Sequence, residues 1–201
     1  MYVRINTIFG DVSKVDAAVE YIETSDRPVV EAAAGNSGLV TLVDRDAGLI
    51  VAASYWDEPL HSSEAVLTRV REGAVAVAGG DLSVESFEVV AGAQPAAAQP
   101  GAAVRFGRLQ IELARIDEAV SFFDEQVLPV LTACSGLCSI QMVLDRSSGA
   151  GIVATAWTDT AAADAAGEAV ARLRGSATDR GGVKFLQVEA YTLIRSSMRL
   201  S

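Results

Sequence analysis

Hydrophobic and polar residues alternate along the segment VRINTIF at residues 3–9, and Gly10 bounds this segment. A period of two is typical of a strand with one buried face. The next segment, residues 13–25, has apolar residues at helical spacing and predicts an amphipathic helix with Ser13 as its N-cap. The buried face of that helix would carry Val15, Ala18, Val19 and Ile22.

Two apolar segments then predict a β-hairpin. LVTLV at residues 39–43 and LIVAASYW at 49–56 flank a turn that runs from Asp44 to Gly48. Apolar runs joined by a short turn that contains Gly are typical of two paired antiparallel strands.

A second helix and a last strand complete the pattern. Residues 62–77 have apolar side chains at helical spacing, and SVESFEVV at 83–90 has the composition of a strand. The order of elements is therefore βαββαβ. This order predicts a four-stranded antiparallel sheet with both helices on one face, which is the ferredoxin-like arrangement.

The whole pattern occurs twice. Asp44-Arg45 and Gly48 recur as Asp145-Arg146 and Gly149, and at this shift of 101 residues 14 of the 54 positions from 3 to 56 are identical. The second copy predicts a helix over about 114–128 and another after an Asp159 cap. Such self-similarity is the mark of a tandem repeat.

The repeat divides the chain. We expect one ferredoxin-like half at 1–92, a Pro- and Ala-rich linker at 93–103, and a second half at 104–201. Both hairpin strands are apolar on both sides, so the sheet face without helices would expose a large hydrophobic surface. We therefore predict an α+β fold in which the two sheets cover each other and form an intrachain, pseudo-dimeric α/β barrel with a cavity between them.

Composition and charge argue against nucleic acids and membranes as binding partners. The 201 residues are 50% hydrophobic with a net charge of -10, which argues against nucleic-acid binding. No apolar run is long enough to span a membrane, and the N-terminus lacks the pattern of a secretion signal, so we expect a cytoplasmic protein without a membrane partner. The two cysteines, Cys134 and Cys138, are too few for a disulfide framework or a zinc site, and we expect them to be inert.

The stretch GNSGLVTLVDRDAGLIVAASYWDEPLHSSEAV at residues 35–66, followed by VESFEVV, resembles the antibiotic-biosynthesis monooxygenase family of the dimeric α/β-barrel superfamily. The resemblance covers nearly the whole chain, once per half, so the chain resembles a fused dimer. Some family members oxygenate polycyclic phenols without metal or flavin, others degrade haem or isomerise lactones. The resemblance implies an oxidoreductase, a cofactor-independent monooxygenase that acts on an aromatic or polyketide-like small molecule, with no cofactor and no metal.

Candidate catalytic residues lie on the first strand. Alternation places Arg4 and Asn6 on one face, which we expect to line the cavity and stabilise a substrate anion. Asn6 resembles the Asn that haem-degrading relatives place beside their ligand. Those relatives also have a Trp and a His in or just after the second helix, and residues 65–75 contain neither, which argues against haem degradation. The second copy has Gly107 at this position, so any site that depends on the Asn would occur once.

Four other residues are candidates for ligand binding. Trp56 and Trp157, at equivalent positions, could stack on an aromatic ligand or anchor the sheet by packing, and their recurrence favours packing. His61, the only histidine, could act as a base or lie at the surface. Arg105, the equivalent of Arg4, could bind an anionic ligand or extend into solvent.

Three functions remain open at this point: a cofactor-independent oxygenase, a non-catalytic protein that binds a small hydrophobic or aromatic molecule, and a structural or interaction module. The third would use the acidic first half, since residues 1–92 carry a net charge of -9 and residues 104–201 only -1. We expect either a monomeric pseudo-dimer or a homodimer of it.

Overall fold

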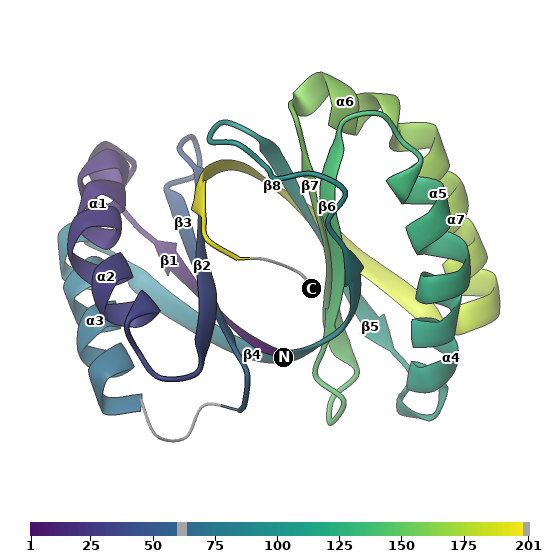
Figure 1. Ribbon diagram of the computed structural model, residues 1–201, viewed down its shortest axis with the longest axis horizontal. Coiled ribbons are helices and arrows are strands. Elements are labelled where there is room, and N and C mark those ends of the chain that lie inside the picture. The colour runs from purple at the N-terminus through teal and green to yellow at the C-terminus, as the bar shows by residue number, and fades with distance from the viewer. Residues whose placement is uncertain (60–63, 199–201) are drawn as a thin grey trace. The chain divides into compact units, whose positions relative to one another are not determined.

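The computed structural model describes residues 1–59 and 64–198, with backbone only at 64–66 and at 180 and 181. Residue contacts divide the chain into two compact units. Unit 1 contains Met1–Ser86 and the described residues from Leu193 onward, and unit 2 contains Phe87–Thr192. Each unit combines a sheet with helices (Figure 1).

Unit 1 has the hydrogen-bonded strand order β4-β1-β3-β2-β8. Its strands are β1 (Tyr2–Phe9), β2 (Asn36–Asp44) and β3 (Leu49–Trp56), joined by the first part of β4 (Asp81–Ala93) and the end of β8 (Val183–Ser196). The predicted hairpin is confirmed, because β2 pairs with β3 from Asp44 opposite Leu49. The helices α1 (Val15–Tyr21), α2 (Arg27–Glu31) and α3 (Glu64–Ala78) cover one face of these strands (Figure 1).

The first helical segment is longer than predicted. It begins with a 3-10 turn at Val12–Lys14, continues through α1, widens into a π-helical turn at Ile22–Asp26 and ends with α2. The predicted cap at Ser13 is wrong: the carboxylate of Asp11 caps the segment by accepting a hydrogen bond from the Ser13 amide at 2.8 Å.

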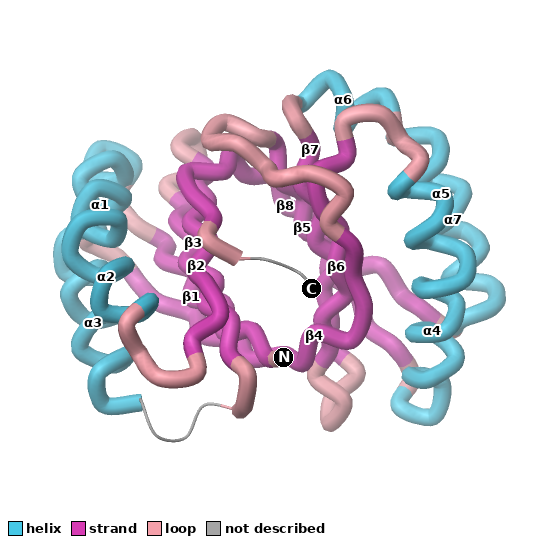
Figure 2. The backbone as a smooth tube through the Cα atoms, viewed as in Figure 1, coloured by secondary structure: helices cyan, strands magenta, loops and turns pink. Residues whose placement is uncertain are grey.

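Unit 2 repeats this arrangement with the strand order β8-β5-β7-β6-β4. Its own strands are β5 (Ala103–Ile111), β6 (Leu137–Leu144) and β7 (Ala150–Trp157). The helices along one face of these strands (Figure 2) are α4 (Ile116–Phe122), α5 (Leu128–Thr132), α6 (Thr160–Ala165) and α7 (Gly167–Gly181). A π-helical turn at Phe123–Val127 joins α4 to α5, and the predicted cap is confirmed, because Asp159 accepts from the Ala162 amide at 2.8 Å.

The Asp-Arg-x-x-Gly motif builds the same turn in both units. Asp44 accepts hydrogen bonds from the amides of Asp46 and Ala47, and the second copy repeats this with Asp145 and Ser147. Gly48 and Gly149 have φ of 70° and 75°, a conformation that suits glycine. Arg45 and Arg146 pair with Asp16 and Asp117, respectively, so this exposed ion pair also recurs.

Each unit has its own hydrophobic core. Ile8, Val15, Ala18, Ile22 and Ile50 pack between the sheet and helices of unit 1. The equivalent cluster in unit 2 is larger and includes Leu109, Ile116, Phe123, Leu131 and Met142. The helix residues Val15, Ala18, Ile22, Ile116 and Phe123 of these clusters are apolar positions that the helical periodicity predicts to be buried.

The predicted fold class is confirmed: the chain is α+β, and its two ferredoxin-like repeats form a pseudo-dimeric α/β barrel. Two strands belong to both repeats, because β4 and β8 each contribute residues to both units. Residues 94–102 join β4 to β5 without helix or strand. Within the described residues, no helix has the length and hydrophobicity that a membrane span requires.

Candidate ligand-binding site

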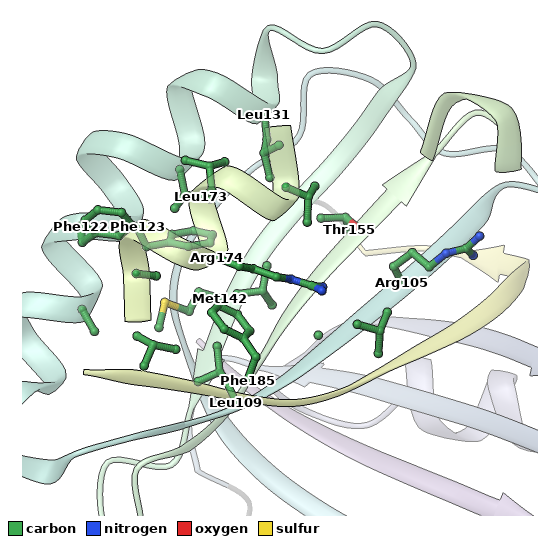
Figure 3. Close-up of a pocket in the computed structure, with 18 of the residues that line it drawn as sticks. Arg105, Leu109, Phe122, Phe123, Leu131, Met142, Thr155, Leu173, Arg174 and Phe185 are labelled. Atoms are coloured by element: carbon green, nitrogen blue, oxygen red, sulfur yellow. The ribbon is translucent and has the colours of Figure 1, made fainter. Parts of the chain in front are cut away.

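A pocket of about 220 Å³ lies in unit 2 between the sheet and the helices. β5 contributes alternate residues, Arg105, Gly107 and Leu109, because side chains two apart on a strand share a face. The apolar wall comes from the helices and from β6, β7 and β8. Figure 3 shows this wall, which includes Phe122, Phe123, Leu131, Met142 and Leu173.

Three polar side chains line this pocket in the described part of the chain: Arg105, Thr155 and Arg174. Thr155 is buried and accepts a hydrogen bond from the indole nitrogen of Trp157 at 3.0 Å. Arg174 projects from α7 across the pocket, and its guanidinium carbon lies 5.3 Å from the centre of the Phe185 ring (Figure 3). Removal from water lowers the pKa of the Arg174 guanidinium from its ordinary value.

The matching place in unit 1 is nearly filled, with a pocket of about 40 Å³. Its lining contains Arg4, Asn6, Ile8 and Ser54, which are the counterparts of Arg105, Gly107, Leu109 and Thr155. Where unit 2 has Gly107 and Val127, unit 1 has Asn6 and Asp26. At these two positions unit 1 therefore has a larger side chain, Asn6, and a more polar one, Asp26, than unit 2.

Asn6 and Asp26 give the unit 1 pocket an unusual polarity. The amide nitrogen of Asn6 donates to the Ala52 carbonyl at 3.1 Å, while its side-chain oxygen is buried with no partner among the described residues. Asp26 is 6% exposed, and within the described chain its carboxyl group makes no hydrogen bond or ion pair. Burial raises the pKa of Asp26 to about 7.

The structure distributes the predicted site residues over the two pockets. Arg4 and Asn6 line the unit 1 pocket, and Arg105 and Trp157 line the unit 2 pocket. Trp56 is absent from the described lining of either pocket, and His61 lies outside the described residues. Both pockets lie between a sheet and its own helices, whereas the sequence prediction placed the cavity on the opposite face of the sheets.

The two tryptophans have the same environment. Trp56 and Trp157 are each 2% exposed, and each donates its indole N–H to a hydroxyl two residues earlier, Ser54 at 2.9 Å and Thr155 at 3.0 Å. This repeated bond supports the packing role for both residues. Trp157 also contributes one wall of the larger pocket.

Arg174 and Asp26 are among the pocket residues that the sequence analysis missed. Arg174 could have been found from the similarity of Arg172-Leu173-Arg174 to Arg69-Val70-Arg71, since Arg71 lines the unit 1 pocket at the equivalent place. Asp26 had only one signal in the sequence, its replacement by Val127 in the second copy.

Metal and thiol chemistry receive no support from the described residues. They contain no group of three His, Cys, Asp or Glu side chains that could hold a metal ion. Cys138 is buried, and burial raises the pKa of its thiol, while the Cys134 thiol lies 3.5 Å from the Val130 carbonyl. A buried thiol with a raised pKa is a poor nucleophile.

Several solved structures share the fold over almost the whole chain. A proposed monooxygenase from Lactobacillus acidophilus superposes with a TM-score of 0.70 at 10% sequence identity, covering 96% of this chain and 93% of its own. A Listeria monocytogenes ferredoxin-fold protein related to antibiotic biosynthesis monooxygenases superposes with a TM-score of 0.60 at 10% identity, covering 97% and 95%. The chain has the antibiotic-biosynthesis-type monooxygenase fold.

An anthrone oxidase-like protein also has this fold. It superposes with a TM-score of 0.65 at 16% sequence identity, covering 97% of this chain and 92% of its own. In sequence, the uncharacterized protein Rv2557 of Mycobacterium tuberculosis is 28% identical over 151 residues, which is 74% of this chain and 67% of the relative. No protein-family model matches the chain.

Proposed function

We propose that the protein binds a small aromatic or polyketide-like molecule in the pocket of unit 2. The cavity of about 220 Å³ carries this proposal, because its walls are mostly apolar and aromatic and it has few polar groups. An apolar cavity of about 150 Å³ is large enough for benzene. The unit 2 pocket therefore suits a somewhat larger molecule, of the size of two fused rings.

Oxygenation without metal or flavin is the reaction that we propose to test in this pocket. We choose it because an anthrone oxidase-like protein has the same fold, and since a fold does not determine a reaction, the activity needs its own test. No Asp, Glu or His is present in the described lining, so a substrate would have to ionise by itself or be held as an anion. Oxygen uptake with a panel of hydroxyanthrones tests this activity. Saturable binding without oxygen uptake above background would instead support the non-catalytic alternative.

The substitution Gly107→Asn tests whether unit 2 holds the ligand. It introduces the side chain that unit 1 has at the same position, and a β-carbon there would lie 3.5 Å from the Arg174 guanidinium and 3.7 Å from the Val153 carbonyl, which are ordinary contacts. The added amide would fill the pocket without a left-handed backbone conformation to oppose it. We expect the affinity for 2-naphthoate and 2-naphthamide, measured by calorimetry, to fall about tenfold or more.

Gly175→Asn is the matched control. Gly175 lies on the same helix as Arg174, is exposed, and has open space where a β-carbon would lie. Its substitution should leave both affinities unchanged. If neither naphthalene derivative binds the unsubstituted protein, or if Gly107→Asn binds them equally well, the proposed pocket is not the binding site.

A further inference from the structure

Arg174 is the one cation whose side chain crosses the apolar pocket in Figure 3. It arises from α7, is half-buried, and its guanidinium lies over the face of Phe185. This cation–π contact partly replaces the hydration that the guanidinium loses in the pocket. Burying a charge without an ionic partner is nevertheless unfavourable.

No protein anion compensates this charge within the described residues. Arg174 makes no hydrogen bond or ion pair there, and the pocket lining contains no acidic side chain. Arg27 in unit 1 shows the usual alternative, since Glu23 and Glu31 both bond its buried guanidinium at 2.8 Å. An arginine stays protonated at neutral pH, so the pocket of unit 2 presents a positive charge without a counterion.

The space beside Arg174 is open because Gly107 has no side chain. A β-carbon at Gly107 would lie 3.5 Å from the terminal Nη2 of Arg174, so this nitrogen faces the part of the pocket that Asn6 fills in unit 1. Arg105 is placed differently. Its guanidinium points away from Arg174 and donates to the Val104 carbonyl at 3.2 Å (Figure 3).

We propose that the ligand of the unit 2 pocket is an aromatic anion, a carboxylate or phenolate, whose charged oxygen binds Arg174 while its rings lie against the apolar wall. This inference rests on the proposed function, that the pocket binds a small aromatic molecule. A guanidinium can form two parallel hydrogen bonds with a carboxylate, which fixes the orientation of the ligand as well as its affinity. Phe185 limits the movement of the guanidinium and so prepares it for this contact.

A pair of ligands that differ only in charge tests the inference. Hydrogen bonds to charged groups correspond to about tenfold to hundredfold in affinity, so 2-naphthoate should bind that much more tightly than 2-naphthamide at pH 7. Arg174→Gln should remove this difference by weakening naphthoate, while the affinity for naphthamide changes by less than about threefold. Calorimetry at fixed ionic strength measures all four values.

Two further variants complete the experiment. Arg105→Gln removes an arginine from the same lining and should leave the preference for naphthoate intact. Arg174→Lys keeps the charge but not the paired donors, and it should retain part of the preference. Arg174→Lys also replaces Arg174→Gln as the test of the preference if circular dichroism shows that Arg174→Gln does not fold.

The outcomes separate the two proposals. Equal affinity for naphthoate and naphthamide, both sensitive to Gly107→Asn, would overturn the anion inference and leave the aromatic pocket standing. A preference for naphthoate that survives in Arg174→Gln and Arg174→Lys but disappears in Arg105→Gln would assign the anion to Arg105 instead. Binding of neither ligand would contradict the proposed function itself.

Discussion

At the scale of single residues, Asp26 is the clearest departure from what packing alone would select. Its carboxyl group is buried, and no described residue compensates it. The second copy has Val127 at the same place, which shows that the scaffold does not need the charge. Residues that weaken the fold in this way are often retained for function.

The raised pKa of Asp26 predicts a pH dependence of stability. Its pKa is about 7 in the folded chain, against an ordinary value of 3.8, so between these values the folded state binds a proton that the unfolded state has lost. The contribution of Asp26 to stability should therefore fall as the pH rises from about 4 to 7 and level off above 7. The penalty above pH 7 is at most about 4 kcal/mol, from 1.4 kcal/mol for each pKa unit.

Asp26→Asn should remove this dependence. The variant stays neutral at every pH, so we expect it to melt at a higher temperature than the unsubstituted protein at pH 8 and to differ little from it at pH 4. Asp46→Asn, at an exposed position in the β2–β3 turn, is the control and should change neither melting temperature. If Asp26→Asn lowers the melting temperature at pH 8, Asp26 has a stabilising partner.

The sequence could predict part of the site at this scale. Strand alternation correctly placed Arg4 with Asn6 and Arg105 with Gly107, because a period of two is a local property of the backbone. It could not show which sheet face holds the pocket. That depends on the helices, whose side chains enter from residues distant in the chain, as Arg174 does.

At the scale of elements, buried Arg27 joins three segments of unit 1. It lies at the start of α2 and donates to the Leu39 carbonyl of β2 at 2.9 Å and to the Arg195 carbonyl of β8 at 3.4 Å. Burial opposes its charge, but hydrogen bonds to Glu23 and Glu31 outweigh that effect and raise the pKa of the guanidinium. The hydrogen bond to Arg195 thereby connects the last residues of β8 to the first helical segment.

Arg27→Leu should destabilise unit 1 by about 3 kcal/mol, because it removes the buried cation that both carboxylates pair with and leaves them only hydroxyl donors, Thr41 for Glu23 and Ser197 for Glu31. Leucine is the residue that the second copy has at this position, Leu128, so its size suits the scaffold. The midpoint of urea unfolding measures the effect. Arg45→Leu is the control, since that arginine is exposed and its ion pair should contribute less than about 1 kcal/mol. Equal midpoints for the two variants would show that the buried network does not hold these elements together.

The elements themselves were largely predictable. The hairpins follow from the Asp-Arg-x-x-Gly turn, whose hydrogen bonds are local in the sequence. The end of the first helix, placed at residue 25, was wrong because Asp26 and Pro28 suggest a break. Proline is tolerated in the first turn of a helix, and here it lies in the first turn of α2, directly after the π-helical turn.

At the scale of the whole molecule, one scaffold occurs twice with two different interiors. The sequence repeat revealed the scaffold, since both copies retain the turn and the tryptophan with its hydroxyl partner. It did not reveal which copy is open. The difference depends on single substitutions between the copies, such as Asn6 in unit 1 and Gly107 in unit 2. These small changes in sequence accompany a large difference in pocket volume, about 40 Å³ in unit 1 and about 220 Å³ in unit 2.

Methyl NMR of the methionines tests most directly that unit 2 alone holds the ligand. The chain has three methionines: Met142 lines the unit 2 pocket, Met198 belongs to unit 1, and Met1 is exposed. On titration with 2-naphthoate, we expect a saturable shift of the Met142 methyl signal, unchanged Met1 and Met198 signals, and loss of the shift in Gly107→Asn. A shift of Met198 with Met142 unchanged, or a Met142 shift that persists in Gly107→Asn, would show that unit 2 is not the binding site.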